Sequence, residues 1–433
     1  MRHSKDRPAR APRTLAWMAA ALLVLGGAAA CDALDSLLEV EAPNQIPEEV
    51  LNDPTKAQLL VNGAISDFDC ALGAYIVLGG ITGEELIDAT QTADRWPYDR
   101  REVSPTDGRY ATFGCAAIGT YTPLSTARFT ADNVLAKLQA WTDAEMPAGT
   151  NRTLLIATAA AYSGYAHLLL GEGFCTAAVD GGPELTQAQM FALAEEKFTV
   201  AIQAATAVGA AADNIRNLAL VGRARAQLDL GDYAGAAADA ALVPANFVYN
   251  ATASATPARR QNRVFEQNGS TDATSVGPLY RNLTFGGVAD PRVPVVNRNR
   301  NATDGTAVWH QTKYPAFTTP IPIATGDEAV LIRAEALARA GQADAARDLI
   351  NTLHTKAGIP AYGGGTPEQV LQQIVEERRR ELFLEGHHLY DLQRFNITPQ
   401  PAAGTAYHKG GTYGTTKCWP LPNVERLNNP NIG

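Results

Sequence analysis

The fold of this chain is decided by one stretch, IVEERRRELFLEGHHLYDLQRF, at residues 374–395. Shortly before it, Thr366 can cap a helix, Pro367 suits the first helical position, and Gln369 completes a capping box. Apolar residues then recur at helical spacing. Gly386 interrupts this pattern, and aromatic residues resume it. The stretch therefore predicts a helix, a sharp glycine step and a second short helix.

Six charged residues, EERRRE at 376–381, lie inside the first of these helices. A solvated face with salt bridges is the ordinary meaning of such a run, and the chemistry alone favours it. Glu376 and Arg380 stand at i,i+4, the favourable order for an exposed pair. The alternative is that an arginine and a glutamate share the face of Leu382 and are buried together. Because a buried charge needs a partner, such a pair would fix how the two helices dock.

The same stretch, as ERRRELFLEGHHLYDLQRF, resembles the C-terminal signature of the SusD/RagB family, E-R-R-x-E-L-x-x-E-G-x-R-x-x-D-L-x-R. His388 departs from it, since the family usually has arginine or another large polar residue there. The resemblance implies a surface lipoprotein that captures nutrients, commonly glycans, for a TonB-dependent outer-membrane transporter of the SusC type. The matching residues, whose expected role is structural, are Glu377, Arg378, Arg379, Glu381, Leu382, Glu385, Gly386, Asp391, Leu392 and Arg394.

Three regions have the pattern of tetratricopeptide-type helix pairs, in which small residues allow tight turns and close helix contacts. They are 217–243, 327–358, and 154–171 with a partner helix at 187–208; a further amphipathic helix is expected at 132–141. The turn glycines are too irregularly spaced for a plain solenoid with a period of about 34 residues. We therefore predict a mainly α fold, a tetratricopeptide-like helix-pair scaffold with long irregular insertions and a few short strands.

The expected organisation is a signal peptide and one SusD-like domain. Aromatic residues lie among Gly, Pro and Asn in two segments without helical rhythm, and long loops of this kind are usually functional. Y-R at 280–281, D-P-R at 290–292, and the W-P-L-P and N-P-N of the tail resemble further family elements. The boundaries are signal peptide 1–30 and domain 31–433, with lipid tether 31–45, helical scaffold about 127–243 and 326–395, binding and loop segments about 67–126 and 245–325, and C-terminal tail 396–433.

The N-terminus has the pattern of an export signal. Five basic residues precede an apolar, small-residue-rich run that is too short for a membrane span. Cys31 follows three alanines, so we expect its lipidation by acyl chains such as palmitate, although a large aliphatic residue is usual at position 28. The formal net charge is already −9, and loss of this basic segment would make the mature chain more acidic. Such an acidic protein has no electrostatic footprint for nucleic acid or for an anionic membrane. Acyl chains, and not a basic patch, would therefore hold it to the membrane.

The chain has five cysteines. With Cys31 assigned to lipid, the other four allow three disulfide connectivities, among which sequence does not choose. We favour Cys70–Cys115, which would close N-terminal loops, and Cys175–Cys418, which would pin the tail to a helix end. No cysteine or histidine cluster suits zinc, and adjacent His387 and His388 would point apart on a helix. No metal or cofactor is therefore expected.

Binding is better supported than catalysis. The chain lacks the common hydrolase and phosphate-binding motifs. Glu84, Glu85 and Asp88 supply carboxylates, but nothing in the sequence marks a pair held across a scissile bond. Aromatic rings that stack on sugars, beside polar side chains, suit a shallow preformed site. The candidate ligand-binding residues are Trp96, Tyr98, Tyr110, Trp309 and Tyr314, although each ring alone is more often a packing residue.

Two functions follow. The first is a nutrient-binding lipoprotein on the cell-surface side of the outer membrane, which takes up an oligosaccharide or another oligomer together with a SusC-like TonB-dependent transporter. The second is a tetratricopeptide-type adaptor that binds protein segments in the bacterial envelope. The interrupted repeat, the lipid-type N-terminus and the long signature favour the first. An exported hydrolase would need a carboxylate pair in a cleft, and we expect no enzyme activity.

Overall fold

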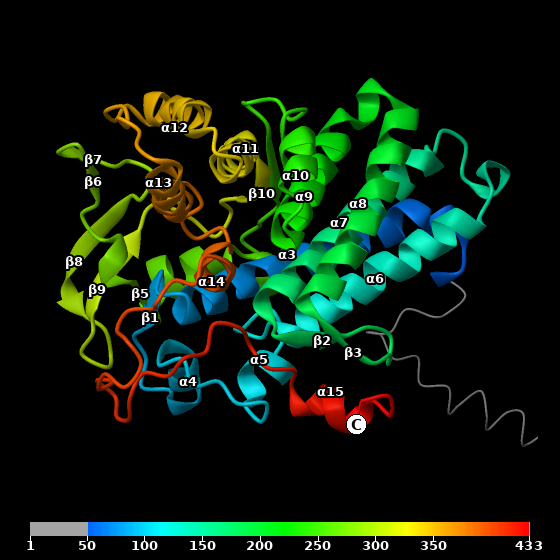
Figure 1. Cartoon of the computed structure of the whole chain (residues 1–433). Coiled ribbons are helices and arrows are strands. Elements are labelled where there is room, and N and C mark those ends of the chain that lie inside the picture. Colours follow the sequence, from blue (N-terminus) through cyan, green and yellow to red (C-terminus); the bar gives the residue numbers. More distant parts are fainter. Residues whose placement is uncertain (1–50, 433) are drawn as a thin grey trace, which may run out of the picture. The chain divides into compact units, whose positions relative to one another are not determined.

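The computed structural model describes residues 51–432 (Figure 1). The signal peptide at 1–30, the lipidation site Cys31 and the tether at 31–45 lie outside the described residues. From Pro54 onward the chain makes one compact unit. Its secondary structure is mainly helical, so the predicted fold class is confirmed.

The predicted helix pairs are present, and their boundaries lie close to the expected ones. The helix expected at 132–141 is longer and begins at Tyr121, inside the segment that was expected to be irregular. Each helix contacts the next one along the chain, from α6 through α10 and again from α11 to α12. The scaffold helices are α6 (Tyr121–Ala140), α7 (Arg152–Gly173), α8 (Gln187–Val208), α9 (Asp213–Leu230), α10 (Tyr233–Ala240), α11 (Gly326–Arg339), α12 (Ala343–Ala357), α13 (Pro367–Glu381) and α14 (His388–Arg394).

Glycines let three scaffold helices approach closely. Phe198 of α8 lies between Gly164 of α7 and Gly222 of α9. A Cβ atom would stand 2.7 Å from the Phe198 ring at position 164 and 2.3 Å from it at position 222. Both distances are shorter than real carbon–carbon contacts, so only glycine fits at positions 164 and 222. The Phe198 ring packs against both glycines and so sets the spacing of α7, α8 and α9.

One long helix was not predicted. Residues 67–82 were assigned to an irregular segment, but they lie in α3 (Ala57–Thr82). This helix is buried on almost every side and contains four glycines, so it shows no amphipathic period and little intrinsic propensity. Its apolar length, like that of α7, would suffice to cross a membrane, but both helices are mostly buried inside the described protein.

The strands form five antiparallel two-stranded ribbons, which pair β1 with β5, β4 with β10, β2 with β3, β6 with β7, and β8 with β9. Most join residues of the two irregular segments, and Figure 1 shows β1, β5, β8 and β9 at one end of the molecule. The strands are β1 (Leu86–Asp88), β2 (Thr176–Ala178), β3 (Glu184–Thr186), β4 (Val248–Ala251), β5 (Thr274–Val276), β6 (Thr284–Phe285), β7 (Val288–Ala289), β8 (Val295–Asn301), β9 (Ala307–Gln311) and β10 (Ile321–Thr325). Short helices complete the fold: α4 (Trp96–Asp99), α5 (Gly108–Thr112) and α15 (Asn423–Asn428).

The signature stretch folds as its sequence predicts. The Thr366 side chain and that of Gln369 cap the start of α13 reciprocally. The helix ends at Glu381, Gly386 takes a φ of +88°, and α14 follows. Only glycine adopts this backbone region without strain.

Three of the six charged residues are buried and the other three only partly exposed, which corrects the favoured expectation of a solvated face. Glu377 is 0% exposed, Arg378 is 5% and Arg380 is 9%. The Arg378 guanidinium pairs with the Asp391 carboxylate at 2.9 Å, and so ties α13 to α14. Glu377 lies between Arg292 at 2.6 Å and His354 at 2.9 Å. The neighbourhood of both cations lowers the pKa of Glu377 despite its burial.

The remaining signature residues bind the same helices to more distant segments. Arg394 pairs with Glu335 of α11 at 2.5 Å, and Glu385 pairs with Lys313 at 2.6 Å. Leu382 packs in a small apolar core cluster. The Arg379 guanidinium donates to the carbonyl of Leu279, and Glu381 lies 3.4 Å from Arg292. Arg394 also lies 3.5 Å from Asp229 of α9, so the signature joins both helical blocks and the irregular segment between them.

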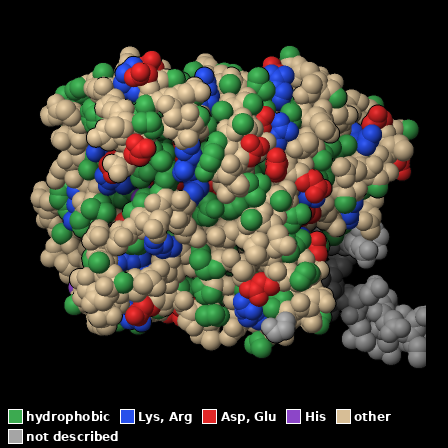
Figure 2. Space-filling view, in the orientation of Figure 1, with side chains coloured by type: hydrophobic (Ala, Val, Ile, Leu, Met, Phe, Trp, Pro, Cys, Tyr) green, Lys and Arg blue, Asp and Glu red, His purple; other side chains and the backbone are tan. Residues whose placement is uncertain are grey.

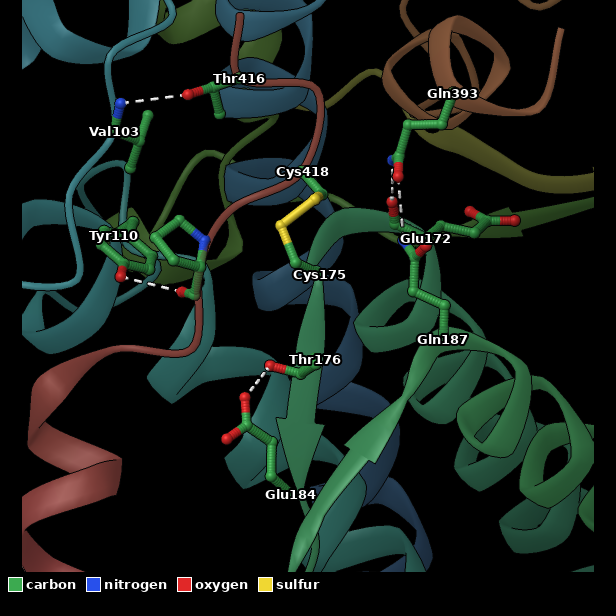
Figure 3. Close-up of a disulfide and its surroundings, with 11 residues drawn as sticks. Val103, Tyr110, Glu172, Cys175, Thr176, Glu184, Gln187, Gln393, Thr416 and Cys418 are labelled. Carbon is green, nitrogen blue, oxygen red and sulfur yellow. Dashed lines mark hydrogen bonds between the residues drawn. A yellow bond between two sulfur atoms is a disulfide. The ribbon is translucent and has the colours of Figure 1, made fainter. Parts of the chain in front are cut away.

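Two disulfides are present, and both have the favoured pairing. Cys70 of α3 is joined to Cys115, and Cys175, just after α7, is joined to Cys418 of the tail. Figure 3 shows the second bond where the tail crosses the end of α7. Beside it, Trp419 is fully buried and exchanges backbone hydrogen bonds with Gly173 and Cys175. The tail is therefore part of the core.

Candidate functional site

Three of the five predicted ligand-binding aromatics are core residues. Tyr98 and Tyr110 are 0% exposed and Tyr314 is 2% exposed. The Tyr110 hydroxyl donates to the carbonyl of Pro420 at 2.9 Å, and the Tyr314 hydroxyl donates to the carbonyl of Leu384 at 3.1 Å. The Tyr98 hydroxyl accepts the N–H of Tyr110 at 3.0 Å. Their predicted place on a binding surface is corrected, because each ring packs an irregular segment onto the scaffold.

The two tryptophans are only partly buried and remain candidates. The Trp96 indole N–H donates to the carbonyl of Thr90 at 3.3 Å, and the Lys409 ammonium lies 5.9 Å from the ring centroid. The Arg281 guanidinium lies 5.1 Å from the ring centroid of Trp309. A cation over one face orients an aromatic ring and leaves the rest of its surface for other contacts.

Side-chain hydrogen bonds join β9, which carries Trp309, to the neighbouring strand β5. The Ser275 hydroxyl of β5 donates to the carbonyl of Ala307 at 2.7 Å and accepts the N–H of Trp309 at 2.9 Å. The Asn268 amide donates to the carbonyls of Thr274 and Trp309 and accepts the N–H of Gln311. Since β1 pairs with β5, a continuous path of hydrogen bonds runs from β1 to β9 and β8.

A hollow of about 340 Å³ opens beside this surface. This volume is at the small end of ligand sites, so the hollow suits one end or branch of a larger ligand. Neither tryptophan is among the residues that line the hollow. Lys409, 5.9 Å from the Trp96 ring centroid, follows the lining residue His408, and Arg281, 5.1 Å from that of Trp309, comes two residues after the lining residue Leu279. The lining residues come from α3, β1, α4, the 278–279 turn and the tail: Ile81, Glu84, Ile87, Asp99, Arg101, Pro278, Leu279, Gln400, Pro401, His408 and Tyr413.

Arg101 forms a fixed wall of the hollow. Its side chain is 2% exposed, and its guanidinium donates to the carbonyls of Gln400 and Pro401 and lies 4.7 Å from the Tyr413 ring centroid. Burial lowers the pKa of Arg101 below its ordinary value, with the nearby Glu84 carboxylate acting against that shift. The guanidinium therefore holds the tail loop and the ring of Tyr413 in place.

Asp99 brings a titratable carboxyl to the same wall. It accepts the Tyr407 hydroxyl at 2.9 Å and the N–H of Asp88 at 3.2 Å. Burial is the main cause that raises the pKa of Asp99 to about 7. Near neutral pH the Asp99 carboxyl therefore gains and loses a proton, and it can donate a hydrogen bond only while it is protonated.

The carboxylates considered for catalysis hold the structure together. Asp88 is 0% exposed and pairs with Arg95 at 2.5 Å and Lys409 at 2.9 Å. Glu85 accepts the N–H of Leu384 at 2.7 Å, and Glu84 accepts the N–H of Gln400. Each of the three carboxylates thus has at least one oxygen bonded to a partner in the chain. Over residues 51–432 no group of three or more His, Cys, Asp and Glu side chains is arranged to hold a metal.

Sequence reasoning missed the contribution of the tail. Gln400, His408 and Tyr413 of the tail line the hollow, but none was a candidate. The only signal was the glycine-rich composition of 404–414, which predicts a loop and does not say where it folds. Its position depends on partners several hundred residues earlier in the chain.

The C-terminal part of the chain matches a known protein family. Residues 327–428 match the model of the SusD family. A stretch of 143 residues is 33% identical to the starch-binding protein SusD of Bacteroides thetaiotaomicron. That match covers 32% of this chain and spans 24% of the length of the relative.

Solved structures match over most of the chain. A SusD-like carbohydrate binding protein from Bacteroides vulgatus has a TM-score of 0.67 at 16% identity, and covers 87% of this chain and 96% of its own. A laminarin binding SusD-like protein has a TM-score of 0.65 at 15% identity, and covers 88% and 98%. At these identities the structures establish the fold. Together with the family match, they confirm the predicted SusD/RagB resemblance.

Proposed function

Starting from a chain with the SusD fold and a SusD-family C-terminal segment, we propose that this protein binds glycans as a nutrient-binding protein. The observation that carries the proposal is the hollow at Tyr413, together with two partly exposed tryptophans, Trp96 and Trp309, whose cation partners Lys409 and Arg281 follow lining residues of the hollow in the sequence. Aromatic rings contact the apolar faces of sugars, and the carboxyl, guanidinium and imidazole groups nearby bond to hydroxyls.

The charge distribution favours a neutral oligosaccharide. Figure 2 shows positive and negative side chains interspersed over the face in view, without one large field of either sign. The hollow itself carries both Arg101 and Asp99. Because Glu84 and Asp88 already have chain partners, we propose binding without hydrolysis.

We further propose a place for this protein in uptake. A signal peptide at 1–30 and lipid on Cys31 would hold it at the outer membrane, facing outward. There it would pass its oligosaccharide to a SusC-like TonB-dependent transporter. Support comes from the family resemblance and the export-type N-terminus.

The binding proposal is tested by glycan affinity. Trp96→Ala and Trp309→Ala should each weaken binding of the recognised glycan by about tenfold in calorimetry, since each removes one aromatic contact. Trp141→Ala is the matched control, a partly buried tryptophan at the end of α6 that belongs neither to the surface of β1, β5, β8 and β9 nor to the hollow. Equal affinities in all three variants would reject the surface with Trp96 and Trp309 as the glycan site.

The transport role is tested by co-purification. We expect the native lipoprotein, extracted from outer membrane in detergent, to bring down a large TonB-dependent barrel in stoichiometric amount. Recovery with soluble envelope proteins instead would favour the adaptor function.

A further inference from the structure

One residue of the signature stretch departs from the family pattern, and it lies behind the wall of the hollow. His388 stands where the pattern usually has arginine or another large polar residue, and its side chain is buried at the start of α14. Its Nε2 atom lies 3.9 Å from a carboxylate oxygen of Glu84, a residue that lines the hollow. The signature therefore reaches the proposed binding site through His388.

Close packing of two backbones brings this pair together. Gly83 follows the end of α3, and a Cβ atom there would lie 2.7 Å from the carbonyl oxygen of Gly79 and 3.3 Å from the backbone of Leu389. Because only glycine fits at this contact, Glu84 and His388, which are the chain neighbours of Gly83 and Leu389, are held beside each other. Glu84 has a φ of +74°, which a residue with a side chain adopts only where its surroundings impose it.

Glu84 carries the contact onward to the tail. One of its carboxylate oxygens lies nearest to His388, and the other accepts the N–H of Gln400. Arg101 donates to the carbonyls of Gln400 and Pro401, and both of these tail residues line the hollow. The Glu84 carboxylate thus bridges α14 and the part of the tail that forms one wall of the hollow.

The imidazole side of this bridge is incomplete. Nε2 of His388 is buried and has no hydrogen-bond partner among the described residues. At 3.9 Å from Glu84 it is too far for a hydrogen bond, but a positive charge at this distance would attract the carboxylate. A buried polar atom without a partner needs an explanation, and a contact that forms when the imidazole is protonated supplies one.

The other charged groups around His388 leave this contact to Glu84. Asp391, on the same helix, is already paired with an arginine. Burial is the main cause that raises the pKa of Glu85 to about 7, and the charge of His388 acts against this shift. The Tyr280 ring lies 5.8 Å from the imidazole, and its own cation is Arg379, 5.2 Å from the ring centroid.

We propose that His388 is a positioning residue for the hollow: its protonated imidazole binds the Glu84 carboxylate, which in turn holds the tail at Gln400. Histidine changes its charge between about pH 5 and pH 8. At acidic pH the ion pair would fix Glu84 between α14 and the tail. At alkaline pH the imidazole is neutral, Glu84 loses this partner, and the tail is held less firmly. The effect on glycan affinity rests on the proposed function, whereas the effect on the tail does not.

The test measures the hold on the tail directly, by hydrogen exchange of the Gln400 amide in the full-length protein in detergent. Gln400 lies between Pro399 and Pro401, which have no N–H, so its exchange is resolved from that of its neighbours. Relative to the intrinsic rate at each pH, protection at pH 5 should be about fivefold higher in the unmodified protein than in His388→Gln. At pH 8 the two should be equal. His388→Arg, with a permanent cation, should keep the higher protection at both pH values.

The matched control is a similar pair away from the hollow. Nε2 of His167 in α7 lies 3.7 Å from the Asp132 carboxylate of α6, and neither residue lines the hollow. His167→Gln should leave the protection of Gln400 as it is in the unmodified protein at both pH values.

A purely structural role would give a different result. Equal losses of protection at pH 5 and pH 8 in His388→Gln, or a His388→Arg protein that loses protection at pH 8 like the unmodified one, would overturn the proposal. Calorimetry of glycan binding should rank the three proteins in the same order at each pH. Exchange that behaves as expected with affinities that do not would overturn the link to binding alone. An unmodified protein that binds no glycan would overturn the proposed function and leave the exchange result standing.

Discussion

At the scale of single residues, Arg378 and Asp391 carry the contact between α13 and α14. Both side chains are 5% exposed, and their charged groups lie 2.9 Å apart. In Arg378→Ala the Asp391 carboxylate stays buried with Arg394 as its remaining partner, at 3.2 Å. We expect the free energy of unfolding to fall by about 3 kcal/mol, measured by urea titration.

The matched control is an exposed pair of the same chemistry. Arg216 and Asp213 lie 3.0 Å apart with side chains 37% and 48% exposed. Arg216→Ala should change the free energy of unfolding by less than roughly 1 kcal/mol, because solvent screens the pair. Equal losses in the two variants would mean that burial does not set the strength of the signature pair.

Asp99 should make stability depend on pH in a definite direction. Its pKa is raised to about 7 in the folded protein, so the native state holds the extra proton between about pH 4 and pH 7. Its contribution to stability is therefore present at low pH and lost as pH rises through 7. We expect the unmodified protein to lose roughly 2–4 kcal/mol relative to Asp99→Asn between pH 5 and pH 8. A difference independent of pH, followed by chemical denaturation, would contradict this.

Residue types identified the candidate rings, but burial decided among them. Trp96 and Tyr98 are two positions apart, and only the tyrosine is fully buried, with its hydroxyl bonded to the N–H of Tyr110. A short turn of α4 sends the two rings in different directions. In a segment without a helical pattern, the sequence does not show which way each ring points. It could therefore identify both rings as candidates but could not tell which one is buried.

At the scale of elements, the bend between α13 and α14 depends on Gly386. Its φ is +88°, and a Cβ atom there would lie 3.2 Å from the Tyr75 ring and 3.3 Å from Ile76. Gly386→Ala should cost about 2 kcal/mol in the free energy of unfolding, from backbone strain and the tight contact. Gly363→Ala is the control, since nothing lies within 4 Å of its Cβ position; it should leave stability unchanged or slightly higher. Comparable losses in both would disprove the special role of position 386.

Helices with one apolar face were predictable from the sequence, and the helix without such a face was not. The cap and end of α13, the bounds of α8 and the end of α12 at Gly358 follow from local signals. By contrast, α3 is surrounded by protein, so its apolar residues do not recur on one face at helical spacing, and this signal of a helix is missing from its sequence. The same contacts that bury it determine where β1 and the hollow lie, which is why the site was less predictable than the scaffold.

At the scale of the whole molecule, the two disulfides close chain segments of very different length. Cys175 and Cys418 are separated by 243 residues, and Cys70 and Cys115 by 45. A cross-link stabilises mainly by restricting the unfolded chain, and this effect grows with the logarithm of the closed segment. The Cys175→Ala/Cys418→Ala protein should therefore lose roughly 1.5 kcal/mol more stability than Cys70→Ala/Cys115→Ala.

The tail gives this comparison a second consequence. The Cys175–Cys418 bond holds the part of the tail that follows Tyr413, while Arg101 grips the tail at Gln400 and Pro401. Loosening the tail end should thus weaken glycan binding at the hollow as well as stability, whereas loss of Cys70–Cys115 should leave the affinity nearer its original value. Calorimetry on both double variants, at a temperature where each is folded, checks this. If the two double variants lost affinity equally, the tail would not be the element that shapes the hollow. The position of Arg101 would then have to depend on α4 alone.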